Sequence, residues 1–354
     1  MGPRSPVIIR VGVAVLLAWS LALVGCGDAK PGPSPASPSA TAVGAAPAPT
    51  AAATAPSTLV AGVLPDASAS PIPLPNVVQL SAPSRDVVWV LVAGQRLFSS
   101  GDRGATWLAR GLPPAVTNAE VSFIDGQEGW LSGVGSPATQ CQQQSFVLWH
   151  TTDSGMTWST LEANGISAAR CKSSLAFVDK VRGFVVASDP NHAPVVYRTA
   201  DGGRTWAPST PIPDPPGFAT QAGGPSLQAG AVQAFGSTLL LPLRAPGQAL
   251  YVTRSTDGGA TWGFVAAIPK VDGGFAMVSA ARWLLVGPAA QSQETADSGA
   301  SWHPFTTDYT QASPVTPVVL FGDPDVGYAT TRGAIQRTTD GGAHWTRIVT
   351  PGTG

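Results

Sequence analysis

The chain has 354 residues, enough for two ordinary domains or one large β architecture. Its 40 glycines and 34 prolines argue against a helical bundle, because both residues are poor in helix interiors. Only 12% of the residues are charged and the net charge is −1, which excludes the dominant basic surface of a nucleic-acid-binding protein.

The N-terminus has the organisation of an export signal. Arg4 and Arg10 accompany an uncharged, mostly apolar run over residues 11–24, whose 14 residues fall short of the roughly 20 that span a bilayer. The run ends in Leu-Val-Gly-Cys at residues 23–26, which resembles a bacterial lipobox. By that resemblance, residues 1–25 are a lipoprotein signal peptide and Cys26 carries a lipid that anchors the protein to the extracytoplasmic face of the cell membrane. An ordinary signal peptide or an uncleaved anchor is the alternative.

Residues 26–75 comprise the lipidated cysteine and a linker rich in proline, alanine, serine and threonine. We expect this linker to be disordered, since it shows no apolar period and almost no charge. Within it, the apolar run Thr58–Leu64 is a candidate strand that joins the folded domain.

Six segments of the remaining chain repeat one pattern: serine or threonine, any residue, aspartate, any residue, glycine, any residue, usually threonine, then tryptophan. The repeated aspartate, glycine and tryptophan are Asp102, Gly104 and Trp107, Asp153, Gly155 and Trp158, Asp201, Gly203 and Trp206, Asp257, Gly259 and Trp262, Asp297, Gly299 and Trp302, and Asp340, Gly342 and Trp345. Successive aspartates are 40 to 56 residues apart, a period that fits one four-stranded propeller blade per repeat.

The repeat has the chemistry of a tight turn. The aspartate accepts hydrogen bonds from nearby backbone N–H groups, the glycine permits a positive φ, and the tryptophan begins the outgoing strand. His344 replaces the hydroxyl residue in the last copy, which predicts a looser sixth turn.

This pattern resembles the Asp-box, or BNR, repeat of sialidases, sortilin-type receptors and photosystem II stability/assembly-factor-like propellers. The resemblance implies that each box lies between the third and fourth strands of a blade. A second recurring element, glycine plus an aromatic residue as in Gly129-Trp130 and Gly183-Phe184, is most similar to the assembly-factor branch. That branch implies a role in holding membrane proteins during maturation.

The expected fold is therefore all-β: a six-bladed propeller of four-stranded antiparallel blades over residues 76–350. The predicted blades are 76–111, 117–163, 174–210, 226–268, 274–303 and 316–350, and a seventh blade is possible if 211–230 contains strands. Either residues 57–64 add a strand to the last blade, or the ring closes by packing alone.

Variable loops are expected on the face opposite the Asp boxes, at 136–144, 164–173, 211–225 and 303–315. The candidate partner-binding residues on this face are Gln142, Gln143, Arg170, Lys172, His192, Asp308 and Tyr309. Cys141 and Cys171 fall in two neighbouring loops, and in an exported protein they predict a disulfide, with two buried free thiols as the alternative.

Catalytic chemistry is poorly supported. By family resemblance, a sialidase requires three arginines, a tyrosine–glutamate pair and an aspartic acid. The predicted innermost strands 119–124, 174–179 and 316–322 contain no arginine, and the four histidines are scattered singly. Calcium at Asp323-Pro324-Asp325 is a minor alternative; we predict no catalytic residue, metal or cofactor. The sequence favours a non-catalytic scaffold for an envelope or membrane protein, with a glycan-binding or sialidase-like hydrolase as the alternative.

Overall fold

The computed structural model describes residues 58–64, 78–138, 141–221, 224, 226–270, 273–287, 289–310, 317–331 and 334–348. The predicted signal peptide, Cys26 and the linker up to residue 57 lie outside these ranges. No helix in the described ranges is long and apolar enough to cross a membrane.

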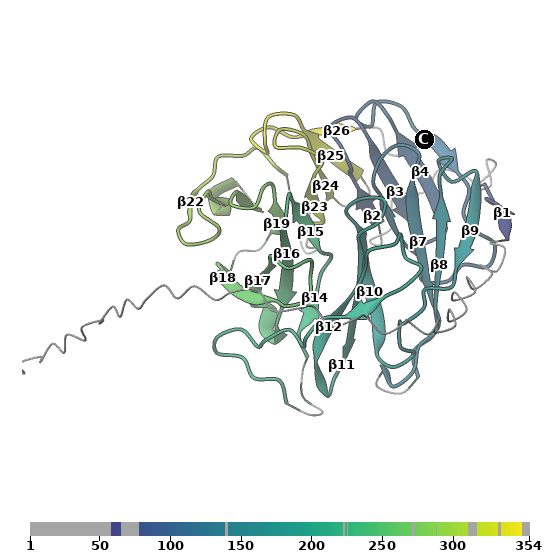
Figure 1. Ribbon diagram of the computed structural model, residues 1–354. Helices are drawn as coiled ribbons and strands as arrows, with labels where there is room; N and C mark the ends of the chain where they lie inside the picture. The colour runs from purple at the N-terminus through teal and green to yellow at the C-terminus, as the bar shows by residue number, and fades with distance from the viewer. Residues whose placement is uncertain are drawn as a thin grey trace, which may run out of the picture. The chain divides into compact units, whose positions relative to one another are not determined.

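Six antiparallel sheets follow one another along the chain and form the blades of a propeller, in agreement with the prediction (Figure 1). Blades one to three comprise β2 (Val78–Ser81), β3 (Val88–Val92), β4 (Arg96–Ser100) and β5 (Leu108–Arg110); β6 (Glu120–Phe123), β7 (Gly129–Val134), β8 (Phe146–Thr151) and β9 (Thr157–Leu161); and β10 (Cys171–Phe177), β11 (Gly183–Asp189), β12 (His192–Thr199) and β13 (Ala207–Pro208). Blades four to six comprise β14 (Gln228–Ala229), β15 (Gln233–Phe235), β16 (Thr238–Arg244), β17 (Leu250–Ser255) and β18 (Gly263–Ile268); β19 (Gly274–Met277), β20 (Trp283–Val286), β21 (Gln293–Thr295) and β22 (His303–Pro304); and β23 (Val319–Phe321), β24 (Gly327–Thr331), β25 (Ala334–Thr338) and β26 (Thr346–Ile348).

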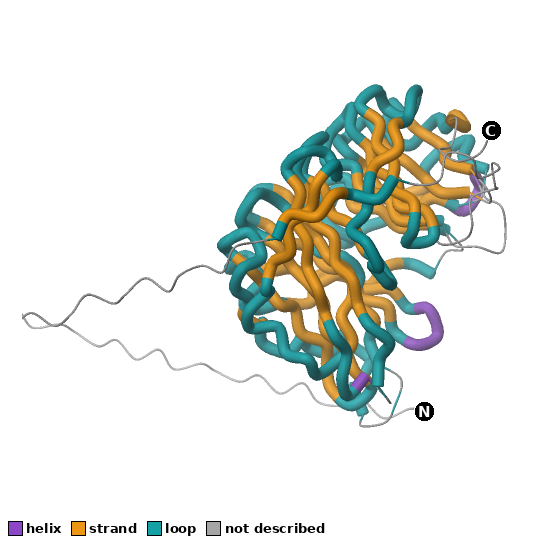
Figure 2. Tube along the Cα trace, turned by 90° about the vertical axis from the view of Figure 1, so that its right-hand side faces the viewer, coloured by secondary structure: helices purple, strands orange, loops and turns teal. Residues whose placement is uncertain are grey.

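Strand and loop account for nearly all of the described chain (Figure 2); the short 3₁₀ turns include Pro246–Gln248 and Ala289–Gln291. Within the described part of 211–230, the strand residues are Gln228–Ala229, and these belong to blade four. The structure therefore has six blades, and the innermost strand of blade four is divided into β14 and β15.

The apolar run ahead of the propeller is a strand, as expected, but it does not join the last blade. β1 (Leu59–Ala61) pairs antiparallel with β9, so that blade two has a fifth, outermost strand. The ring closes instead by packing: one buried cluster combines Val88 and Val90 of blade one with Tyr328 and Ile335 of blade six. Five further clusters fill the other five blade interfaces.

The glycine–aromatic element explains how neighbouring blades fit together. A Cβ on Gly129 would lie 2.2 Å from the ring of Phe123, so glycine leaves room for that ring. Phe123 in turn stacks on Trp89 of blade one, with ring centroids 3.6 Å apart. The repeated motif is thus part of the interface between blades.

Candidate functional site

Each Asp box is a hydrogen-bonded hairpin turn between the third and fourth strands, as the resemblance implies. In blade three, the Thr199 hydroxyl donates to Asp201 Oδ1 and accepts from the Gly203 N–H. The backbone N–H and hydroxyl of Thr205 donate to the two carboxylate oxygens of Asp201, at 2.9 and 2.6 Å. Partial burial opposes ionisation of Asp201, but these hydrogen bonds outweigh it and lower the pKa of the carboxyl. The carboxylate oxygens are occupied within the turn, which makes this aspartate a structural group.

The sixth box is not loosened by its histidine, contrary to the expectation from sequence. The His344 N–H donates to Asp340 Oδ1 at 2.9 Å, and the imidazole Nδ1 donates to Oδ2 at 2.5 Å. The imidazole therefore takes the place of the missing hydroxyl.

The Asp boxes share one face of the ring with the turns that follow the innermost strands. The Arg103 N–H donates to Asp86 O at 3.0 Å, and the Ser154 N–H donates to Gln127 O at 2.9 Å. The same contact joins Gly341 to Asp325 O in blade six. These bonds define the Asp-box face and fix the ends of the innermost strands.

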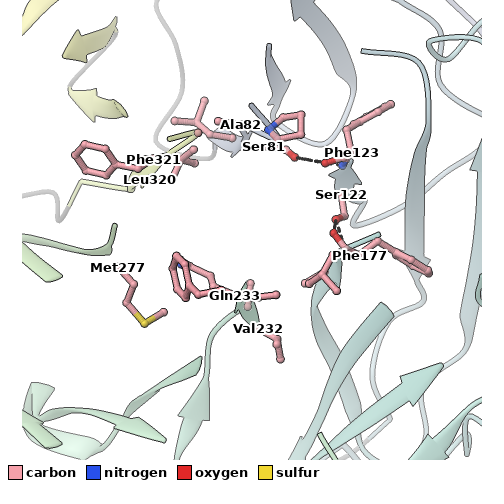
Figure 3. A pocket seen from close by; sticks show the side chains of 18 of the residues that line it. Ser81, Ala82, Ser122, Phe123, Phe177, Val232, Gln233, Met277, Leu320 and Phe321 are labelled. Carbon is pink, nitrogen blue, oxygen red and sulfur yellow. Dashed lines mark hydrogen bonds between the residues drawn. The ribbon is translucent and has the colours of Figure 1, made fainter. Parts of the chain in front are cut away.

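A cavity of about 750 Å³ lies among the innermost strands of all six blades (Figure 3). Its wall includes the turn residues Pro83, Ser279 and Pro324, so the cavity extends toward the Asp-box face. It therefore differs in place from the loop face, where sequence reasoning put the partner site. The residues around it are mainly apolar: Val232 and Met277 are buried between blades, and Leu320 is partly exposed.

On one side of this central cavity, side-chain oxygens of one blade accept hydrogen bonds from backbone N–H groups on the innermost strand of the next blade. Gln79 and Ser81 of blade one bond the backbone of Val121 and Phe123 in blade two. Glu120 and Ser122 of blade two do the same for blade three, where the Phe177 N–H donates to Ser122 Oγ at 2.7 Å (Figure 3). Burial raises the pKa of the Glu120 carboxyl.

On the other side, the corresponding backbone groups have no such partner among the described residues. Val278 and Gly322 turn their N–H groups toward the second strands of blades five and six, at Arg282 O and Val326 O. Along an antiparallel strand, the backbone N–H and C=O groups of successive residues point to opposite sides. The backbone N–H and C=O of Met277 and Phe321 therefore point toward the cavity. Blade five carries Ala276 where blade two carries Ser122, so it offers no hydroxyl to blade six. The sequence contained this difference, but only the register of the strands reveals it.

Asp323 is the charged residue among those that line the central cavity. Its Oδ1 accepts from the N–H groups of Asp325 and Val326, and its Oδ2 lies 3.6 Å from Arg85. The described part of the chain has no cluster of three metal-binding side chains here or elsewhere. The wall of the cavity thus offers apolar contacts and backbone hydrogen bonds.

The predicted disulfide is present on the loop face: Cys141 is bonded to Cys171, 30 residues later. Lys172 beside it was predicted to meet a partner, but it is only 4% exposed. Its Nζ donates to the backbone oxygens of Gln144, Ala169 and Arg170 at 2.9–3.1 Å, and burial lowers the pKa of the ammonium to about 8. Lys172 therefore stabilises the loops under the disulfide instead of forming a surface.

Four of the other predicted partner residues lie in the same region of blades two and three. Gln142 and Gln143 are exposed. Arg170 Nε lies 3.1 Å from Asp189 Oδ2, and His192 Nδ1 lies 2.9 Å from Asp189 Oδ1. Asp189 thus holds a partly buried guanidinium and an exposed imidazole side by side.

The last two predicted partner residues lie elsewhere and have structural contacts. Tyr309 is 3% exposed, packs edge-on against Trp345, and donates its hydroxyl to Thr330 O. Asp308 is exposed, but its Oδ1 accepts from the Trp345 N–H at 2.7 Å. These two residues join blade five to blade six.

No family profile matches the chain, and no curated protein matches it in sequence. Its fold is similar to that of solved propellers. YCF48 bound to D1 peptide is 19% identical over 78% of this chain and 99% of its own, with a TM-score of 0.43. YCF48 from Cyanidioschyzon merolae is 16% identical over 76% and 83%, with a TM-score of 0.46. Trypanosoma rangeli sialidase in complex with 2,3-difluorosialic acid is 13% identical over 83% and 58%, with a TM-score of 0.49.

Proposed function

We propose that this protein is an exported lipoprotein, anchored through Cys26, whose propeller is a non-catalytic scaffold that binds an extended segment of an envelope or membrane protein. The lipobox-like ending of the apolar N-terminal run supports export and lipidation. The Cys141–Cys171 disulfide fits an oxidising compartment outside the cytoplasm.

The central cavity is the observation that carries the binding role. A peptide strand laid along blades five and six satisfies the backbone groups of Met277 and Phe321, as in the addition of a strand to a sheet edge. Its apolar side chains meet Phe235, Leu320 and Phe321, which line the cavity and are only partly buried. A cavity of about 750 Å³ is within the usual range for a ligand site.

A sugar fits this wall less well, because glycan hydroxyls require many hydrogen-bonding side chains. The cavity offers Ser81, Ser122, Gln233, Ser279 and Asp323. The hydroxyls of Ser81 and Ser122 are already used between blades, and the carboxylate of Asp323 is engaged by its own turn and by Arg85. The lining favours an apolar peptide over a glycan.

The test is photo-crosslinking of the protein in its envelope, followed by identification of the captured segment. Leu320→Arg fills the cavity with a charge, and Ala276→Ser supplies the hydroxyl that closes the edge of blade six. We expect each to lower the affinity for the captured peptide about tenfold or more. The control variant Phe264→Ser lies on the outermost strand of blade four, outside the cavity wall, and leaves binding unchanged. Unchanged binding by both cavity variants contradicts this site, and sialoside hydrolysis that is lost on a cavity substitution establishes the glycosidase alternative.

A further inference from the structure

The segment that enters the propeller has specific backbone contacts on the outer edge of blades one and two. β1 pairs Leu59 with Ser159 in β9. The Gly62 N–H donates to Met156 O at 2.9 Å, beside the second Asp box. Val63 and Leu112 then exchange two backbone hydrogen bonds, at 2.7 and 3.0 Å.

Three glycines make this contact close. A Cβ on Gly62 would lie 2.4 Å from Gly155 O and 2.8 Å from the Cα of Gly111. Between Leu59 and Ala61, the side chain of Val60 turns inward and packs on the core cluster that contains Trp158. The segment is therefore seated in one register, and its remaining side chains have fixed directions.

The large side chains among these are apolar and face solvent. Leu59, Val63 and Leu64 are 69%, 59% and 65% exposed. Met156, in the adjoining Asp box, is 67% exposed, and Leu108 in β5 is 58% exposed. Five of the nine exposed large apolar side chains in the described part of the chain belong to this small region.

Leu108 is grouped with these residues because its side chain lies on the face of β5 that is turned toward Met156. It lies on the same face of β5 as Arg110, two residues later. The Cβ of Arg110 is 3.7 Å from the position that a Cβ on Gly155 would take, next to Met156. We call Leu59, Val63, Leu64, Leu108 and Met156 the apolar outer rim. Soluble proteins rarely expose such a group without a binding partner.

The position of the rim indicates the partner. The rim surrounds the point where the described chain begins, and 31 residues separate it from Cys26. A chain of that length reaches about 110 Å at most, so a lipid on Cys26 keeps the rim within about that distance of the bilayer. Tethers of this kind raise the effective concentration toward millimolar, which makes a weak surface contact persist.

We propose that the apolar outer rim rests on the membrane surface, an inference that depends on the lipid anchor of the proposed function. The propeller then stands on the edge formed by blades one and two. The central cavity and the loop face are not part of this contact and remain open to a partner.

Vesicle flotation of the chain Gly27–Gly354 tests the rim without the lipid. That chain retains the whole propeller, because every described contact lies within residues 58–348. The vesicles contain phosphatidylethanolamine and phosphatidylglycerol. We expect the triple variant Leu59→Ser, Leu64→Ser and Met156→Ser to lower the vesicle partition coefficient about tenfold or more. The matched control is Val181→Ser with Phe264→Ser, which removes exposed apolar side chains from blades three and four and leaves partition unchanged.

The outcomes separate this inference from lipidation. Equal flotation of the triple variant and the control, or no flotation of the parent chain, overturns the membrane contact. A concentration-dependent dimer that the triple variant abolishes, without flotation, assigns the rim to a second copy and also overturns it. Lipidation is read separately, from the mass of the Cys26-containing peptide of protein recovered from envelopes.

Discussion

Trp130 of blade two stacks on Phe177 of blade three, with ring centroids 3.8 Å apart and planes 4° apart. Trp89 and Phe123 repeat this contact between blades one and two. A stacked pair at the same level of successive interfaces fixes the rotation of one blade relative to the next.

Phe177→Ala should destabilise the propeller by about 3–5 kcal/mol, because it leaves a cavity beside Trp130 at an interface where Phe177 is 6% exposed. Urea unfolding followed by tryptophan fluorescence measures the change. Phe264→Ala is the control: Phe264 is 40% exposed in β18, and a loss below about 1 kcal/mol is expected. Equal losses for both variants contradict the role of the stack.

Removal of the disulfide should lower stability without changing the fold. Cys141 and Cys171 close a loop across 30 residues, for which the chain-entropy estimate is about 3–4 kcal/mol. The double variant Cys141→Ser, Cys171→Ser should therefore unfold at lower urea concentration with unchanged far-UV circular dichroism. Titration of two thiols in the denatured, unreduced parent protein would refute the bond itself.

The fold was readable from sequence because the Asp box couples local chemistry to a fixed place in a blade. Each position of the box has one structural role, as in Asp201, Gly203 and Trp206. Because the box occurs once per blade, the number of boxes predicts the number of sheets. The central cavity was not readable, since its character depends on which residue faces the next blade. Ser122 and Ala276 occupy equivalent positions in the first strands of blades two and five, and strand register alone shows that one closes an edge and the other leaves it open. The prediction that Tyr309 contacts a partner failed for a similar reason. Its position in a variable loop does not reveal that its ring is buried against Trp345.

Ser122→Ala should cost about 1–3 kcal/mol, because it leaves the buried N–H of Phe177 without an acceptor. Thermal unfolding measures the loss. Ser279→Ala serves as the comparison, since the Ser279 hydroxyl accepts only within its own turn, from Ala281 and Arg282. A smaller loss at Ser122 than at Ser279 would argue against a stabilising bond between blades two and three.

The Asp boxes should make the protein sensitive to strong acid. The pKa values of Asp102 and Asp297 are lowered from 3.8 to about 2, chiefly by the side-chain hydrogen bonds from Thr106 and Ser301. A lowered pKa in the folded state means that the stabilisation is present above about pH 4 and is lost as the pH falls toward 2. Thermal melts between pH 5 and pH 2 should show this decline. Asp297→Asn should already be less stable at pH 7 and should show a shallower decline, whereas parallel curves would contradict the assignment.

His344 should give the sixth box a pH dependence of the opposite sign near neutrality. The hydrogen bond from its imidazole to Asp340 raises the pKa of His344 above 6.5. A raised pKa means that the extra stability is complete below about pH 6.5 and is lost as the pH rises through the folded-state value. In His344→Thr, a hydroxyl makes the same contact as Thr205 makes with Asp201, and it does not titrate in this range. The melting temperature of the parent protein should therefore fall relative to this variant as the pH is raised from 6 to 8, and a constant difference across that range would show that the imidazole is neutral in its contact with Asp340.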